Sequence, residues 1–462
     1  MVFSSLMFLF VFLPVVLGVY YILPRKFRNA FLLIADLFFY GWGEPVLVFL
    51  MIFTIVINYF AGIIMSKAGN KKLVLIITLI IDFGLLAFFK YEGFISENLN
   101  VIIPFLHIPS LSIPLPIGIS FYTFQIVSYI IDLYRNETDV QKNIISFGTY
   151  VSLFPQLIAG PIVRYRDVSE QLSHRRENPE QFARGVRLFT LGLAKKVLLA
   201  NPLGLMWDTL RETTGGGAAA SWAGIIAFSL QIYYDFSGYS DMARGLGNML
   251  GFEFLKNFDY PYISKSITEF WRRWHISLGT WFREYVYIPL GGNKKGKIRT
   301  LVNLLIVWML TGLWHGASWN FLLWGLYFGI ILIIEKLFLL KALEKLPAII
   351  GHIYSILIIV FGWIIFYYSD DVGGFAELCR FVPTLFGGGI LSSDAGAVIT
   401  GNLSLLAAGI IASTPIIRKI YDYLNKKKGY RIAEPVVIVI ILLLCTASLV
   451  NNSYNPFLYF KF

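Results

Sequence analysis

The chain has 462 residues, of which 57% are hydrophobic and 15% are charged, and its formal net charge is +11. Soluble domains carry about 25% charged residues, so this composition excludes a soluble protein and indicates an integral membrane protein. The basic residues lie in short loops between apolar segments, which is typical of membrane topology and argues against binding to nucleic acid.

The chain begins with an apolar segment, residues 3–23, that no basic residue precedes. A cleaved signal peptide would carry basic residues before its apolar run, so this segment is predicted to stay in the membrane. Arg25, Lys26 and Arg28 follow it, and basic residues remain on the cytoplasmic side of a membrane. We therefore expect the N-terminus outside, in a multi-pass protein of the inner (cytoplasmic) cell membrane.

Further apolar segments follow closely along the chain, and a span needs about 20 apolar residues. The candidate spans are residues 3–23, 28–41, 46–65, 72–89, 115–134, 144–160, 186–206, 221–236, 300–315, 319–340, 349–368, 398–417 and 432–450. Segments 28–41 and 144–160 are short enough to be re-entrant or tilted, so we expect about 10–12 crossings. The prediction is an all-α polytopic membrane protein in which residues 1–462 form a single domain.

Residues 264–288 carry an aromatic stripe rather than a uniformly apolar run. The residues that recur at helical spacing are Trp271, Trp274, Leu278, Trp281 and Tyr285. Charged residues occupy the other faces, so the pattern predicts one helix that lies at the membrane interface or packs sideways. His275 flanks this stripe.

His315 ends the uncharged stretch TLVNLLIVWMLTGLW at 300–314. An ionisable group in a membrane is costly and is usually retained for a task, and histidine can act as a general base near neutral pH. On a helix, Trp308, Gly312, His315 and Trp319 would share one face. Gly312 and Gly316 would then let a substrate approach the backbone beside His315.

Six motifs together resemble one family. They are LPIGISFYTFQ at 115–125, QIYYDFSGYSD at 231–241, the segment 270–292 that begins FWRRWHISL, LTGLWHGA at 310–317, FPQLIAGP at 154–161 and YNPF at 454–457. Together they resemble the membrane-bound O-acyltransferase family, in particular its bacterial alginate O-acetyltransferase-like branch. The resemblance extends over nearly the whole chain.

This resemblance implies a multi-helix fold around a thin central region with a tunnel, which the acyl donor enters from the cytoplasm and the acceptor from outside. It implies that His315 is the family's essential histidine and His275 its second histidine. The donor would be acetyl-CoA, with no permanently bound cofactor. The acceptor would be an exported cell-surface polysaccharide, reached through a separate extracytoplasmic acetyltransferase partner.

Several of the remaining candidate residues have more than one possible role. Trp314 and Gly316 flank His315 and could contact substrate, and His275 could assist catalysis, bind the donor or only make a structural hydrogen bond. Arg272 and Arg273 could bind the phosphates of coenzyme A, or could instead extend toward lipid headgroups.

A second group of candidates lies in the motif at 231–241. Asp235, Ser237 and Tyr239 could bind substrate, but Asp235 and Asp241 could instead cap a helix or pair with Arg244.

The isolated Cys379 and Cys445 indicate neither a disulfide framework nor a zinc site, and we expect no metal. No G-x-S-x-G sequence is present, which favours direct histidine-based transfer over a covalent serine enzyme. One alternative function is D-alanyl transfer to teichoic acid from a carrier protein. The other is a transporter or pore that carries glycan or acyl groups without catalysing a reaction. It would fit the apolar spans and the buried residues Asp36, Asp82 and Asp132.

Overall fold

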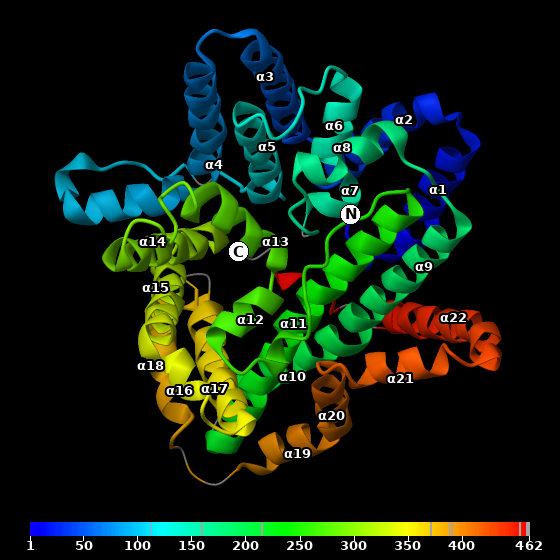
Figure 1. Ribbon diagram of the computed structural model, residues 1–462. Helices are drawn as coiled ribbons and strands as arrows, with labels where there is room; N and C mark the ends of the chain where they lie inside the picture. Colours follow the sequence, from blue (N-terminus) through cyan, green and yellow to red (C-terminus); the bar gives the residue numbers. More distant parts are fainter. Residues whose placement is uncertain are drawn as a thin grey trace. The chain divides into compact units, whose positions relative to one another are not determined.

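In a membrane the backbone N–H and C=O groups must be satisfied within the protein, and a helix satisfies them locally. The computed structural model accordingly consists of helices joined by loops, without strands, in the residues that it describes (Figure 1). These are residues 1–111, 113–158, 160–213, 216–369, 372–387, 389, 391–451 and 454–458. Ala159, in the motif at 154–161, lies outside them. The predicted all-α class is confirmed.

The chain divides into two compact units, which are described separately. Unit 1 contains Met1–Phe189 and Ser240–Leu255, and unit 2 contains Thr190–Tyr239 and Lys256–Phe462. The helices α9 (Pro179–Ala194) and α11 (Gly217–Met249) contribute residues to both units. A single domain over residues 1–462 stays a prediction.

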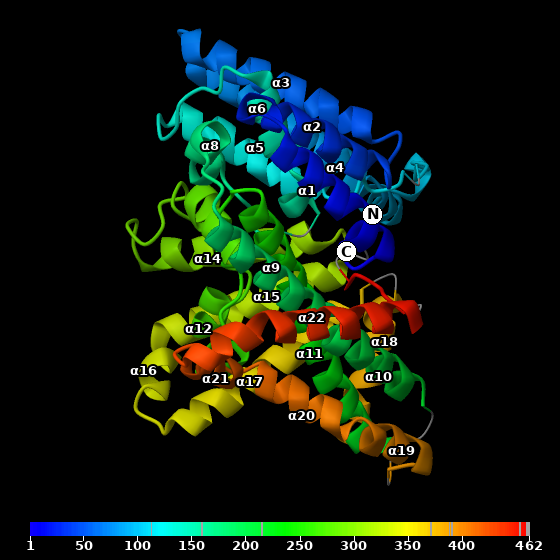
Figure 2. The same cartoon turned by 90° about the vertical axis from the view of Figure 1, so that its right-hand side faces the viewer.

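Unit 1 is built on helices that pack side by side. Its other helical segments are η1 (Phe8–Phe12), α1 (Leu13–Ile22), α2 (Arg25–Gly41), α3 (Val48–Lys67), α4 (Lys71–Ile102), η2 (Pro104–Leu106), α5 (Ile119–Tyr134), α6 (Ile144–Ser152), α7 (Phe154–Leu157) and α8 (Tyr165–His174). Helix α3 contacts α4, α5 and α6, and α2 contacts α6; Figures 1 and 2 show α3, α4 and α5 next to one another.

Unit 2 contains the histidine motifs. Its other helical segments are η3 (Lys195–Ala200), α10 (Asn201–Glu212), η4 (Pro261–Ile263), α12 (Ile267–Arg273), α13 (Ile276–Phe282), η5 (Arg283–Tyr287), α14 (Lys297–His315), α15 (Trp319–Ile334), η6 (Glu335–Leu339), α16 (Leu340–Leu343), α17 (Ala348–Tyr367), α18 (Gly374–Thr384), α19 (Ser393–Gly401), α20 (Leu403–Ala412), α21 (Ile416–Leu424) and α22 (Lys428–Asn451). Helix α15 contacts both α14 and α17.

Among the described residues, seven helices are long and apolar enough to cross a membrane, or eight if the bent pair of α19 and α20 is one span. They are Val48–Lys67, Lys71–Ile102, Pro179–Glu212, Lys297–His315, Trp319–Leu343, Ala348–Tyr367 and Ile432–Asn451. This confirms a multi-pass protein, with fewer such helices than the 10–12 crossings expected. Two candidate segments form the shorter helices α2, of 17 residues, and α5, of 16 residues, and α5 is buried along nearly its whole length.

The single helix predicted over residues 264–288 is wrong. Helix α12 ends at Arg273, and α13 begins at Ile276 and continues into η5. His275 lies at the break with a φ of +44°, in the left-handed region that a non-glycine residue rarely adopts. The aromatic periodicity is therefore distributed over two helices that meet at this histidine.

Helices α14 and α15 pack with their backbones in close contact, because glycines lie at the crossing. A Cβ atom at Gly312 would overlap the carbonyl oxygen of Phe321, and a Cβ atom at Gly325 would overlap that of Trp308. Helix α14 ends at His315 and α15 begins at Trp319. The expected shared face from Trp308 to Trp319 is therefore wrong, since Trp319 belongs to the next helix.

We predict that Gly325→Ala destabilises the protein, because the added methyl group forces α14 and α15 apart. Overpacking of this kind typically costs about 1–3 kcal/mol. Gly84→Ala is the matched control, because Gly84 lies within a membrane-length helix and has no atom within 4 Å of its would-be Cβ. Thermal unfolding in detergent should show a lower Tm for Gly325→Ala only. Equal Tm values for both variants would contradict the packing described here.

Candidate active site

A cavity of about 650 Å³ in unit 2 contains both histidines singled out from the sequence. It is lined by residues of α12, α13, η5, α14 and α15, among them His275, His315, Arg272, Arg283 and Tyr287. His275 and His315 are separated by 40 positions in the chain, and the ring of Trp314 packs against both. The cavity therefore brings together two groups that can exchange protons and two guanidinium groups. A tunnel from this cavity to both membrane faces stays a prediction.

His315 occupies an aromatic site at the end of α14. Its ring centroid lies 5.0 Å from that of Trp314, 5.1 Å from Trp324 and 5.2 Å from Phe366. The residue is 6% exposed and still lines the cavity. These rings exclude bulk water from the imidazole, which strengthens its electrostatic interaction with any group that enters the cavity.

His275 is held at the break between α12 and α13. Its Nδ1 lies 3.2 Å from Oδ1 of Asn257, and the ring of Phe236 packs edge-on at 4.6 Å. The residue is 2% exposed, and burial lowers the pKa of its imidazole from the ordinary 6.5 to about 3. The imidazole is therefore neutral at physiological pH and keeps one nitrogen lone pair.

The carboxylate of Glu335 fixes the start of α12, and the sequence analysis did not identify it. Its two oxygens accept hydrogen bonds from the backbone N–H groups of Ile267 at 2.6 Å and Thr268 at 2.7 Å. The hydroxyl of Tyr354 donates a further bond at 3.1 Å. Glu335 is 1% exposed. A buried carboxylate thus satisfies backbone donors that an apolar neighbour would leave unpaired.

The two adjacent arginines predicted to bind donor phosphates have different surroundings. Arg273 forms ion pairs with Glu269 at 2.9 Å and Asp259 at 3.6 Å, and it does not line the cavity. Arg272 is exposed and lines the cavity, and within the described part of the chain it makes no ion pair. The structure therefore places Arg272 with the histidines and Arg273 in a structural ion-pair cluster.

Arg283 also lines this cavity, and the sequence analysis missed it. Like Arg272 it is exposed and forms no ion pair among the residues that the structure describes. The sequence contained a signal for this position of Arg283. Helical spacing places it on one face with Ile276, Thr280 and Tyr287, and all four residues line the cavity.

The glycines beside His315 do not leave room for a substrate. A Cβ atom at Gly316 would overlap the ring of Phe321, just as one at Gly312 would overlap the Phe321 backbone. These glycines admit α15 against α14 instead. Trp314 is 4% exposed, and its ring contacts the two histidines.

The three candidates from the motif at 231–241 lie elsewhere in unit 2 and do not line the cavity. Asp235 forms a buried ion pair with Lys196 at 2.6 Å and accepts a hydrogen bond from the Leu458 backbone N–H at 2.9 Å. Lys196 also donates to the carbonyl oxygen of Pro456.

The other two residues of that motif are also buried. The ring centroid of Tyr239 lies 4.6 Å from that of Phe457. Ser237 is 1% exposed, and its hydroxyl has no hydrogen-bond partner among the described residues. Asp235 and Tyr239 of this motif therefore contact Leu458 and Phe457, near the end of the described residues. Asp241, in unit 1, pairs with Arg244 at 3.2 Å, as the alternative reading expected.

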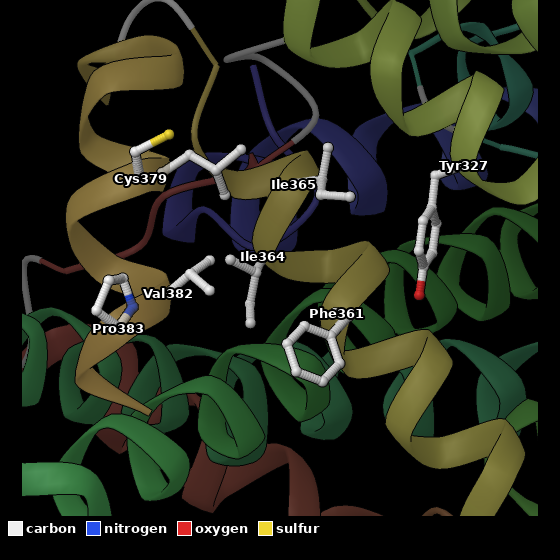
Figure 3. A pocket seen from close by; sticks show the side chains of 8 residues that line it. Tyr327, Phe361, Ile364, Ile365, Cys379, Val382 and Pro383 are labelled. Atoms are coloured by element: carbon white, nitrogen blue, oxygen red, sulfur yellow. The ribbon is translucent and has the colours of Figure 1, made fainter. Parts of the chain in front are cut away.

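A second cavity in unit 2, of about 590 Å³, lacks the chemistry of the first. Figure 3 shows Phe361, Ile364 and Ile365 of α17 facing Cys379, Val382 and Pro383 of α18, with Tyr327 at the other side. The Tyr327 hydroxyl donates to the Ile358 carbonyl oxygen at 2.9 Å, so the lining offers little besides hydrocarbon. Within the described residues, no group of three or more His, Cys, Asp or Glu side chains could hold a metal ion.

Comparison with known proteins identifies relatives over the full length of the chain. Residues 133–369 match the model of the membrane-bound O-acyltransferase family. The probable alginate O-acetylase AlgI of Azotobacter vinelandii is 39% identical over an alignment that covers 100% of both chains. The corresponding protein of Pseudomonas aeruginosa is 45% identical over 79% of this chain and 72% of its own. The peptidoglycan O-acetyltransferase of Helicobacter pylori is 34% identical over 79% of this chain and 77% of its own.

We predict that Asp235→Ala destabilises the protein by about 3–5 kcal/mol, because it leaves the Lys196 charge buried without its partner. The double variant Lys196→Met, Asp235→Leu removes both charges and should recover most of this stability. Thermal unfolding of the two variants measures the difference. If Asp235→Ala unfolded like the unmodified protein but lost acyl transfer, Asp235 would have a direct role in the reaction.

Proposed function

We propose that this chain, which belongs to the membrane-bound O-acyltransferase family and is an O-acyltransferase, transfers acetyl groups toward hydroxyls of an exported cell-surface polysaccharide. Relatives named alginate O-acetylase and peptidoglycan O-acetyltransferase support this acceptor class, since both names specify glycan polymers. The observation that carries the proposal is the single cavity that holds His275, His315, Arg272 and Arg283.

His315 acts as the general base in this proposal. It removes the proton of the acceptor hydroxyl while the oxygen attacks the acetyl carbonyl of a thioester donor, and such assistance is worth roughly 10²–10⁴-fold in rate. Collapse of the tetrahedral intermediate forms the ester C–O bond and breaks the C–S bond. The imidazolium then returns its proton to the leaving thiolate, so atoms and charge balance. The aromatic rings around His315 keep water from competing as the acceptor.

Acetyl-CoA is the proposed donor, used as a co-substrate and not retained as a bound cofactor. Its phosphates require cations, and arginine binds phosphate through two parallel hydrogen bonds. Arg272 and Arg283 offer unpaired guanidinium groups at the cavity in the described structure, whereas the Arg273 guanidinium is bound by Glu269 and Asp259.

The donor is proposed to enter from the cytoplasm. Tyr287 lines the cavity, and the chain then continues through the basic residues Lys294, Lys295 and Lys297 into α14. Basic loops lie on the cytoplasmic side of a membrane, which supports this side for the cavity entrance, an outside N-terminus and an inner-membrane location. The acceptor would then be reached from outside, through a separate extracytoplasmic partner.

The transporter alternative has less support from the contacts of the buried carboxylates in unit 1. Asp36 accepts a hydrogen bond from the Phe154 N–H at 2.9 Å, and Asn58 donates to Asp82 at 2.8 Å. Oδ2 of Asp132 lies 3.7 Å from Nε of Arg166, within ion-pair distance. These partners give the carboxylates a structural role without any transported solute.

D-Alanyl transfer would use the same base, and the mass of the added group distinguishes it from acetylation.

We predict that His315→Ala lowers surface acetylation by at least about 100-fold, because the base is lost. His174→Ala is the control, since this exposed histidine ends α8 in unit 1 and should leave acetylation unchanged. Mass spectrometry of surface glycans from cells that express each variant measures the modification. Full acetylation in cells with well-folded His315→Ala protein would contradict the role of His315 as the base, and a D-alanyl mass would favour D-alanyl transfer.

We further predict that Arg272→Gln and Arg283→Gln each raise the apparent KM for acetyl-CoA by about tenfold. This corresponds to the loss of one hydrogen bond to a charged group, about 1.5 kcal/mol. Arg273→Gln is the comparison, because that side chain pairs with Glu269 outside the cavity and should change Tm more than KM. Initial rates in membrane vesicles at varied acetyl-CoA concentration give the KM values. An increased KM for Arg273→Gln alone would move the donor site away from this cavity.

A further inference from the structure

Two donors from Ser277 and a ring nitrogen of His275 converge on one side-chain oxygen, Oδ1 of Asn257. Oδ1 of Asn257 accepts hydrogen bonds from the backbone N–H of Ser277 at 3.0 Å and from the Ser277 hydroxyl at 3.0 Å, and it lies 3.2 Å from Nδ1 of His275. Asn257 is 1% exposed. Its backbone carbonyl also accepts the N–H of Ile276 at 3.0 Å. One residue, distant from the helix break by about 18 positions, thus contacts every residue from 275 to 277.

These contacts favour a proton on Nδ1 of His275, because the Ser277 hydroxyl bonds Oδ1 of Asn257 at 3.0 Å and lies farther, at 3.5 Å, from Nδ1. A backbone N–H can only donate, so the Asn257 atom that faces Ser277 must be the carbonyl oxygen and not the amide nitrogen. The same oxygen can bond Nδ1 of His275 only if Nδ1 carries a hydrogen. In a neutral imidazole Nε2 is then the unprotonated acceptor. Nε2 is buried and has no hydrogen-bond partner among the described residues.

The backbone of His275 is strained, and Asn257 helps to hold it in its conformation. A non-glycine residue in the left-handed region costs of order 1–3 kcal/mol and persists only when its surroundings hold it there. The residues around Asn257 also hold this segment in place. The backbone carbonyl oxygen of Asp259 accepts a hydrogen bond from the Arg273 guanidinium, and the Asp259 backbone N–H donates to the Arg273 carbonyl oxygen. Strain of this kind concentrates at functional sites, where it orients a reacting group.

We propose that Asn257 is a positioning residue that locks His275 in the Nδ1-protonated tautomer, so that Nε2 accepts a hydrogen bond from a substrate hydroxyl other than the one that His315 deprotonates. The inference rests on the proposed acetyl transfer, because a substrate must supply that hydroxyl. His275 lines the cavity, whereas Asn257 and Ser277 do not, so the Nδ1 edge of the ring faces the protein. The other edge is the one left for a substrate.

The groups around His275 are consistent with a neutral ring. Arg272, Arg283, Tyr287 and His315 line the same cavity, and none of them is a carboxylate that would favour an imidazolium. The carboxylates on neighbouring segments have other partners: Arg273 binds Glu269 and Asp259, and Lys196 binds Asp235. From α11, the uncharged ring of Phe236 covers His275.

The kinetic test compares Asn257→Leu with Asn257→Asp in membrane vesicles that contain the full chain and labelled acetyl-CoA. The leucine variant lacks the acceptor, so kcat should fall at least tenfold, as is typical when a group that orients a histidine is removed, with KM for acetyl-CoA within about twofold. The aspartate variant keeps the acceptor and should restore kcat. Its carboxylate favours the imidazolium, so the acidic limb of the pH–rate profile should move to higher pH.

Asn248→Leu is the matched control for folding, since Asn248 is also a buried asparagine and bonds only the Arg244 carbonyl oxygen in the described contacts. It should change Tm without moving the pH profile. Unchanged kcat in Asn257→Leu, or an aspartate variant without a shifted acidic limb, would overturn the proposal.

A second measurement does not depend on activity or on the variants of Asn257. Solid-state NMR of ¹⁵N-histidine-labelled protein distinguishes the two neutral tautomers, and the His275→Gln spectrum assigns the signal among the five histidines. We expect a protonated Nδ1 and an unprotonated Nε2. A protonated Nε2 would refute the inference even if the chain proves to be an acetyltransferase. Absence of acetyl transfer in the unmodified protein would instead refute the proposed function.

Discussion

The contact between the backbones of α14 and α15 determines where His315 lies. Glycines at positions 312, 316 and 325 remove the side chains that would separate the helices, so the Phe321 ring and backbone fill the space beside His315. The imidazole then packs among Trp314, Trp324 and Phe366. In a lipid environment, helices gain little from hydrophobic association and depend on such close packing. The catalytic geometry proposed here is thus a consequence of helix packing and not of a flexible loop.

The sequence identified the helical membrane class, the family and both histidines, because motif spacing and apolar length report on these directly. It did not reveal the break at His275. Periodicity counts side chains along one helix, whereas the break depends on hydrogen bonds that Asn257, distant in the chain, accepts from residues 276 and 277. The separation of Arg273 from Arg272 had a sequence signal, since Glu269 lies four residues before Arg273, a spacing typical of an ion pair on one helix. The pairing of Asp235 with Lys196 had none.

Buried carboxylates in this protein act mainly as structural acceptors. Asp36 caps the N–H of Phe154, Glu335 binds the first N–H groups of α12, and Asp235 neutralises Lys196. An unsatisfied backbone or side-chain group in a membrane costs several kcal/mol, so a polar residue is retained wherever the helices leave such a group. An ionisable residue within a span therefore becomes a functional candidate after its internal partners have been counted. Outside the candidate spans, the same count leaves Nε2 of His275 and the Arg272 guanidinium without a partner among the described residues, whereas Asp36 and Asp235 have partners.

The ion pair between Lys196 and Asp235 has a consequence for how the protein is made. Its surroundings include Pro456, which is 260 positions after Lys196 in the chain, and the N–H of Leu458. A ribosome adds residues from the N-terminus onward, so both charges enter the membrane well before these last partners exist. During that interval they need temporary shielding by water, lipid headgroups or the insertion machinery. Final assembly of this region must therefore follow the emergence of residues 456–458.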